Sequence, residues 1–197
     1  FDISDMYDYM NKYKILTMQF VFRQPQMIKI TPHIQVRFKT NLDADIVGVR
    51  EAAKQYFSDI TGYAQTFYPS QLARFINNLS AVEYTPNCFA FDTEITMYPG
   101  NRDVVRIWNE IVPGSITGNI DIGIAGIISD VPTSGGMGEL MHSTEGKIGE
   151  IRYADGLMIF DQSVTFTQPY TIGFELVNKD FITTQREGFL YFEEDFD

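Results

Sequence analysis

The chain has 197 residues, of which 44% are hydrophobic and 14% aromatic, a composition typical of a folded, rather β-rich protein with its own core. Its 26 acidic residues against 15 basic ones give a formal net charge of −11, which disfavours nucleic acid as a partner because phosphates are repelled by the molecule as a whole. A single cysteine, Cys88, excludes an internal disulfide and a thiolate metal cluster, so we expect synthesis in a reducing compartment.

The first predicted element is a short amphipathic helix over residues 3–13, where apolar residues recur at helical spacing. Residues 14–31 are predicted to form an edge strand or an extended connector, because Pro25 cannot donate a ladder hydrogen bond. Apolar and polar residues then alternate over residues 32–41, which predicts a strand with one buried and one solvated face. The expected buried face consists of Ile34, Val36 and Phe38.

Two helices are predicted next. The first covers residues 45–60, with Asp43 as its N-cap and Gly62 just past its end. The second begins at Pro69, is capped by Ser70 and weakens after residue 77. The residues expected to face inward are Ile46, Val49, Ala53, Phe57 and Ile60 in the first helix, and Leu72, Phe75, Ile76 and Leu79 in the second.

A return strand is predicted over residues 89–98, and proline and glycine at residues 99–100 mark a boundary. The second half is expected to consist of strands and turns, including a hairpin in which Asp155 and Gly156 form a tight primed turn. Its predicted strands cover residues 120–128, 146–153, 157–161, 163–167, 170–177 and 188–192. The predicted fold class is therefore α+β, with an α-β-α-α-β unit over residues 1–98 and a β-rich unit over residues 99–197.

Two motifs invite a catalytic or phosphate-binding interpretation. The glycine-rich segment 133–138 lacks the Gly-Lys-Ser/Thr ending of a phosphate loop, so an exposed loop is the simpler interpretation. His142 and Ser143 could form a hydrolase triad with Asp130 or Asp155, but no nucleophile elbow surrounds Ser143. The other available base is His33.

The remaining candidates are carboxylates and the single tryptophan. Asp92 and Glu94, or residues 193–195, could bind a hard cation, yet neither group has the ligand spacing of a calcium loop, and solvated charge is the simpler interpretation. Trp108 is either an interface anchor or a core residue. We assign no catalytic, cofactor-binding or metal-binding residue and predict that the chain is not an enzyme.

No segment predicts membrane insertion. The longest apolar run, residues 120–128, contains Asp121 and two glycines and falls well below the roughly 20 residues that span a bilayer. The chain begins at Phe1 without a methionine or a signal peptide, which indicates a fragment or a processed product of a longer protein.

Several motifs occur in an order that resembles a known family. They are Lys12-Tyr13-Lys14, the strand Ile30-Thr31-Pro32-His33-Ile34-Gln35-Val36-Arg37-Phe38-Lys39-Thr40-Asn41-Leu42, the helix from Asp45, Phe67-Tyr68-Pro69-Ser70-Gln71-Leu72, and the later Ile148-Gly149-Glu150-Ile151-Arg152-Tyr153 to Ile159-Phe160. This order is similar to that of the baseplate J-like proteins of contractile-tailed bacteriophages, and within them to the C-terminal portion of T-even-like wedge-ring proteins. Residues 101–146 do not share the pattern.

The resemblance implies a structural role in the virion. Copies of such a protein pair and join into a ring around the tail hub, contact other wedge and hub proteins, and transmit the trigger for sheath contraction. The resemblance carries over no cofactor and no catalytic residue, and it implies synthesis in the host cytoplasm. The alternatives are a tail-associated hydrolase or carbohydrate-active enzyme that uses Asp/Glu pairs, and a tail-fibre adaptor that acts as a binding module.

Overall fold

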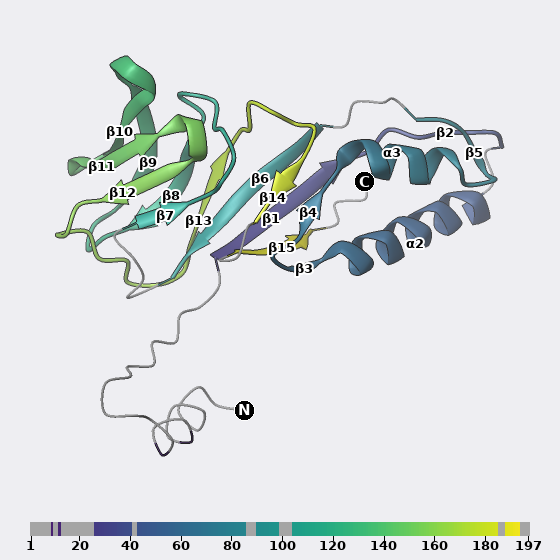
Figure 1. Ribbon diagram of the computed structural model, residues 1–197, viewed down its shortest axis with the longest axis horizontal. Helices are drawn as coiled ribbons and strands as arrows, with labels where there is room; N and C mark the ends of the chain where they lie inside the picture. The colour runs from purple at the N-terminus through teal and green to yellow at the C-terminus, as the bar shows by residue number, and fades with distance from the viewer. Residues whose placement is uncertain are drawn as a thin grey trace.

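The dominant feature of the computed structural model is a sheet of eleven strands that runs along most of the molecule (Figure 1). The structure describes residues 9, 12, 26–40, 43–85, 90–98, 104–184 and 188–193. The strand order is β3-β15-β1-β6-β13-β8-β9-β10-β11-β12-β7. The bounds are β1 (Gln26–His33), β3 (Gly62–Tyr63), β6 (Ala90–Met97), β7 (Val104–Arg106), β8 (Thr117–Asp121), β9 (Ala125–Pro132), β10 (Met137–His142), β11 (Gly146–Arg152), β12 (Leu157–Phe160), β13 (Tyr170–Phe174) and β15 (Gly188–Phe192).

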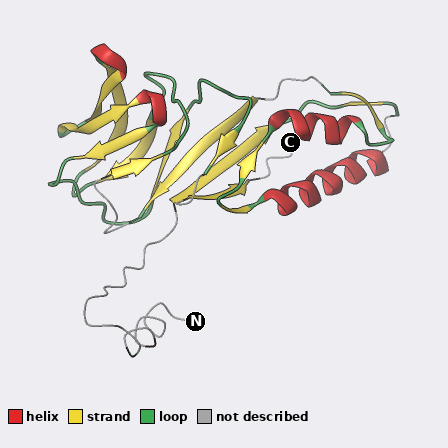
Figure 2. Ribbon diagram, in the orientation of Figure 1, coloured by secondary structure: helices red, strands yellow, loops and turns green. Residues whose placement is uncertain are grey.

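Two short ribbons and two helices complete the described part of the chain. Strands β2 (Arg37–Phe38) and β5 (Val82–Tyr84) form one ribbon, and β4 (Thr66–Phe67) and β14 (Ile182–Thr183) form the other. The long helices are α2 (Asp43–Ile60) and α3 (Pro69–Asn77). Figure 2 shows that these helices lie together at one end of the molecule, whereas the opposite end consists of strands, turns and two short 3₁₀ helices, Ser134–Gly136 and Tyr153–Asp155.

The predicted α+β class is wrong, because the fold is mostly β. Of the described residues, 46% lie in strands and 21% in helices. Strands that were not predicted, namely β7, β10 and the second half of β9, account for part of the difference. In addition, β15 pairs in parallel with β1 and β13 pairs antiparallel with β6, so both halves of the chain share one sheet. Such pairings join segments from opposite ends of the sequence and leave no local signal. The boundary between residues 98 and 99 stays a prediction, but strand pairing crosses it.

The helices pack through aromatic side chains onto the β1–β15 region. Phe57 of α2 stacks on Phe192 of β15 with ring centroids 4.5 Å apart, and Tyr56 of α2 contacts Phe75 of α3 at 4.9 Å. Phe67, which is 1% exposed, lies 5.0 Å from Phe192 between the sheet and the helices. Burying one aromatic side chain of this kind contributes roughly 1.5–3 kcal/mol, so this cluster anchors the helical end.

The helix boundaries agree with the prediction, and the capping details differ. Helix α3 begins at Pro69 after Tyr68, with no side-chain cap, so the predicted N-cap Ser70 lies inside the first turn. Asp43 is the first residue of α2 rather than the residue before it, and its side chain lies outside the described part. Ile46 is 40% exposed, which corrects its expected inward position.

Several strand predictions also need correction. β1 pairs on both sides, so it is an interior strand rather than an edge strand, and it ends at His33. The alternation from residue 34 to 39 is confirmed by burial, although only the two residues of β2 form a ladder there. Residues 120–128 form the end of β8, a turn and the start of β9 rather than one strand. Residues 163–167 form no strand.

The hairpin predicted around Asp155 and Gly156 is confirmed, because β11 and β12 pair antiparallel across it. The turn is a 3₁₀ turn over Tyr153–Asp155 followed by Gly156 with φ of +59°, so only one of the two predicted positive-φ residues adopts that conformation. A Cβ at Gly156 would lie 2.7 Å from the Cβ of Ile107, so this position requires glycine. The predicted helix over residues 3–13 and the tail after residue 193 lie outside the described residues, apart from Tyr9 and Lys12.

Candidate functional site

Asp130, one of the two aspartates considered for a triad, has a structural role in the β-rich end. Its carboxylate is 8% exposed and accepts hydrogen bonds from the backbone amides of Gly114 at 2.6 Å and Ile116 at 2.8 Å. The hydroxyl of Tyr153 donates a third at 2.6 Å. Burial, with the hydrogen bond to Asp130, raises the pKa of Tyr153. The carboxylate thus holds the β7–β8 connection against β9 and the β11–β12 hairpin.

The other residues considered for that triad, His142 and Ser143, are not assembled into one either. His142 is 2% exposed, and its Nδ1 accepts hydrogen bonds from the backbone amides of Thr144 at 3.4 Å and Glu145 at 3.2 Å. The hydroxyl of Ser143 accepts a hydrogen bond from the backbone amide of Ile127 at 3.0 Å. These contacts stabilise the β10–β11 turn and its neighbour β9, and they leave no base positioned on Ser143 within the described residues.

The glycine-rich segment forms an exposed 3₁₀ turn, Ser134–Gly136, between β9 and β10. Gly135 and Gly136 have φ of +75° and +76°, values that favour glycine. The segment leads into strand β10 rather than a helix, so it has no helix N-terminus of the kind that binds phosphate.

The candidate carboxylates contact cationic or titratable side chains. The ammonium of Lys29 in β1 contacts two carboxylates. One belongs to Glu94, its partner on β6, and the other to Glu193, which follows the last residue of β15. Burial lowers the pKa of Lys29, but the hydrogen bonds to the two carboxylates outweigh it, so its pKa lies above the ordinary value. Asp92 lies 3.0 Å from Nε2 of His33 on the same face of the sheet.

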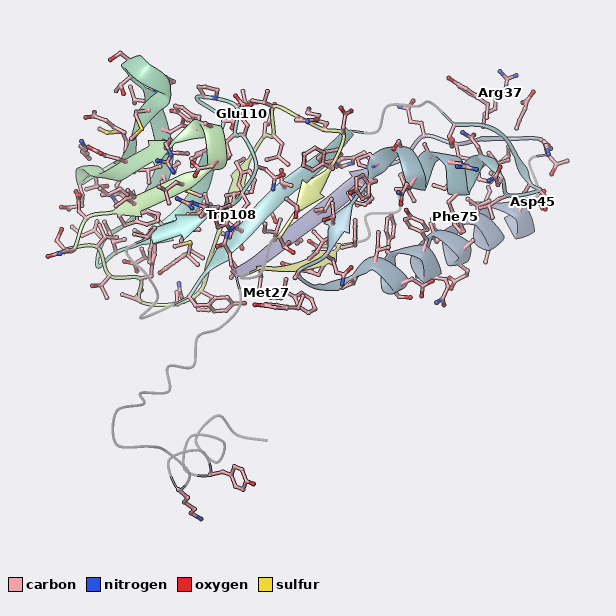
Figure 3. All side chains as sticks on the ribbon, viewed as in Figure 1. Met27, Arg37, Asp45, Phe75, Trp108 and Glu110 are labelled. Atoms are coloured by element: carbon pink, nitrogen blue, oxygen red, sulfur yellow. The ribbon has the colours of Figure 1, made fainter. Side chains whose placement is uncertain are left out.

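Trp108 lies at the surface and not in the core, with 39% of its area exposed (Figure 3). Its φ of +64° falls in the left-handed region, which costs a bulky residue about 1–3 kcal/mol. The backbone amide of Trp108 donates to the carbonyl of Asp155 at 3.0 Å, and that of Ile107 donates to the carbonyl of Gly156 at 3.1 Å. The β11–β12 hairpin therefore holds the tryptophan in a strained conformation.

One arginine contacts the tryptophan, and a second shares its carboxylate partner. The guanidinium of Arg106 lies over the indole, 4.5 Å from the ring centroid, and its Nε is 3.2 Å from Oδ2 of Asp155. Arg152 binds the same carboxylate through two hydrogen bonds, at 2.8 and 2.7 Å. The hydrogen bonds from Arg152 lower the pKa of Asp155. Burial acts in the opposite direction, and the positive charges of Arg152 and Arg106 lower the pKa further. The result is an ordered cationic and aromatic cluster in an acidic protein.

Other exposed apolar side chains lie on neighbouring segments. The backbone amide of Val177 donates to the carbonyl of Glu110 at 2.9 Å, and the side-chain amide of Asn109 donates to the carbonyl of Thr183 at 3.0 Å. In the β4–β14 ribbon, the rings of Tyr68 and Phe181 lie 6.5 Å apart. We call this region the seam surface; it consists of Tyr68, Arg106, Trp108, Glu110, Arg152, Asp155, Val177 and Phe181.

Sequence reasoning singled out Trp108 and Asp155 from this surface and missed their neighbours. Arg106 precedes the tryptophan by two residues, which in an extended segment places both on one face, so that contact had a local signal. Tyr68 and Phe181 come from segments far apart in the chain, and nothing in either segment indicates that they meet.

Two of the hollows that the described residues line bear on the hydrolase alternative. One, of about 430 Å³, lies beside the β8–β9 turn, and its titratable lining residues are Glu145 and Lys147. Lys147 already binds Glu139 at 3.1 Å and Glu150 at 2.8 Å. The other hollow, of about 290 Å³, lies along α3. Ser163 also lines the first hollow, and within the described residues no hydrogen bond joins its hydroxyl to Glu145 or Lys147.

Two further observations bear on the class of function. Within the described ranges, no three His, Cys, Asp or Glu side chains are grouped so that they could hold a metal ion. In the same part of the chain, no helix combines the length and the apolarity that crossing a bilayer requires.

Comparison with known proteins does not identify a family for this chain. No family model matches it, and no curated protein shows a significant match. The resemblance to the baseplate J-like proteins therefore stays a prediction.

Proposed function

We propose that the chain is a structural component of a contractile phage tail baseplate, located in the virion, that associates with copies of itself and with other wedge and hub proteins. On this proposal it joins wedges around the tail hub and transmits the trigger for contraction. It acts through surfaces rather than through a catalytic pocket.

The observation that carries the proposal is the arrangement of the first half of the chain. Leaving aside the two-residue strands β3 and β4 between the helices, the elements occur in the order β1, β2, α2, α3, β5, β6, and the helix pair packs on the sheet region that contains β1. This is the strand, helix, helix, strand order that the family resemblance implies. Fold order alone leaves function open, so the proposal rests on this order together with the sequence motifs.

The surroundings of the chemically interesting side chains favour a structural role over the hydrolase alternative. The described candidates bind backbone groups or oppositely charged side chains. Asp130 accepts hydrogen bonds from two backbone amides of the β7–β8 connection, and Glu94 and Glu193 both bind Lys29. A glycosidase needs two carboxyl groups that face a substrate cleft, about 5–9.5 Å apart. Neither described hollow is lined by two carboxylates.

Light scattering across a concentration series tests the proposal. A ring component is expected to shift from the 22.5 kDa monomer to dimers or larger species as concentration rises. A mass that stays at 22.5 kDa at every concentration contradicts self-association and favours the tail-fibre adaptor instead.

A further inference from the structure

The seam surface combines exposed apolar side chains with a rigid base. Trp108, Tyr68, Phe181 and Val177 are 39%, 42%, 41% and 49% exposed, although each is large and apolar or aromatic. They alternate with buried neighbours: Asn109 is 8% exposed, and Phe67 and Ile182 are 1% and 0% exposed. The exposed side chains therefore project outward from segments whose other face belongs to the core. Exposed aromatic residues on a rigid base are typical of binding hot spots.

The charges of the eight residues that define the seam surface balance, and the exposed Glu175, Lys179 and Asp180 on the adjoining segment add one net negative charge. Arg106 and Arg152 carry two positive charges, and Asp155 and Glu110 carry two negative ones. The whole chain has a formal net charge of −11, so two copies repel each other on approach. A nearly charge-balanced, aromatic surface is a place where a second copy can approach with little of that repulsion.

The seam surface also contains both guanidinium groups and aromatic rings, which form favourable contacts with each other. Its two guanidinium groups lie together on Asp155, and the contacting rings of Tyr68 and Phe181 lie on the β4–β14 side. Guanidinium groups stack on aromatic faces, as Arg106 already does on Trp108. A two-fold axis would bring the arginines of one copy onto the Tyr68–Phe181 pair of the other, twice in the same contact.

We propose that the seam surface binds the seam surface of a second copy of this chain across a two-fold axis. This inference rests on the proposed function, because it names the contact through which the copies associate. The strained backbone of Trp108 fits this role, since the ring is held outward before the partner arrives and little freedom is lost on binding.

Single substitutions test which surface is used. Trp108→Ala and Phe181→Lys are each expected to weaken dimerisation at least tenfold, measured by sedimentation equilibrium. Tyr84→Ala is the matched control, because Tyr84 is 56% exposed on β5 and lies outside the seam surface. Circular dichroism confirms that each variant folds. If the wild type associates and the seam variants associate equally well, the seam surface is wrong while the proposed self-association stands.

A charge swap tests the two-fold arrangement. Arg152→Glu and Phe181→Lys should each weaken association, whereas the double variant should recover it, because the axis places position 152 of one copy against position 181 of the other. Asp155 keeps Arg106 as a partner in the Arg152→Glu variant. If the double variant associates no more tightly than the weaker-binding single variant, the two-fold contact is wrong. A wild type that remains monomeric throughout overturns both this contact and the self-association of the proposed function.

Discussion

At the residue scale, Asp130 shows how one buried carboxylate can hold a long connection in place. It accepts hydrogen bonds from Gly114, Ile116 and Tyr153, which belong to the β7–β8 connection and the β11–β12 hairpin. Trp108 belongs to the same β7–β8 connection. Its position therefore depends on the hairpin contacts at the start of the connection and on the Asp130 contacts near its end.

Replacing Asp130 with alanine should lower the free energy of unfolding by roughly 2 kcal/mol or more, because the donors on the buried residues Ile116 and Tyr153 lose their acceptor and each buried unsatisfied group costs about 1–3 kcal/mol. Urea denaturation measures the change. Asp161→Ala, at an exposed position, serves as the control and should change the free energy of unfolding by less than about 0.5 kcal/mol. Equal effects of the two substitutions would contradict the role assigned to Asp130.

The interactions of the Asp155 carboxylate are expected to stabilise the folded protein at neutral pH and to lose this effect in acid. Its hydrogen bonds to Arg152 lower its pKa in the folded state, so the unfolded chain binds the proton more tightly. The stabilisation is therefore present above the ordinary aspartate pKa of about 3.9 and is lost as the pH falls through the lower folded-state pKa. Asp155→Asn should be less stable than the wild type at pH 7, and the gap should narrow below about pH 4. Urea midpoints across this range check it, and a gap independent of pH would refute it.

At the scale of the element, alanine substitutions at two glycines are expected to change the stability of the protein in opposite directions. A Cβ at Gly149 of β11 would lie 2.3 Å from the carbonyl oxygen of Ile159 on the paired strand β12. A Cβ at Gly48 of α2 would meet no atom within 4 Å.

Gly149→Ala should destabilise the protein by roughly 1–3 kcal/mol, because the strand must shift. Gly48→Ala should stabilise it by roughly 0.5–1 kcal/mol, because alanine favours the helix and glycine does not. Thermal melting compares the two variants directly. A rise in melting temperature for Gly149→Ala would mean that β11 and β12 are not paired in this register.

Local patterns predicted the elements whose cause is local. Helix α2 follows from apolar residues at three- and four-residue steps, and the β11–β12 hairpin follows from Gly156. Residues 120–128 were predicted as one strand because nearly all are apolar, but Gly123 has φ of +106° and turns the chain there. The exposed Ile46 shows that helical spacing alone does not decide which side of a helix is covered.

At the scale of the whole molecule, the sheet order and the seam surface could not be predicted from the chain. The parallel pairing of β15 with β1 joins segments from opposite ends of the sequence and makes one sheet of what was predicted as two units. The seam surface likewise assembles Tyr68, Trp108 and Phe181 from separate segments. Both depend on long-range packing, which periodicity and spacing do not encode.

The central claim is that this chain assembles with copies of itself through the seam surface. Hydrogen exchange measured at low and at high protein concentration tests it most directly, because it reports both association and its location. The account predicts slower exchange at high concentration in peptides that cover residues 107–112 and 175–183, with no change in peptides from α2. Exchange that is independent of concentration everywhere, or protection confined to α2, would contradict it.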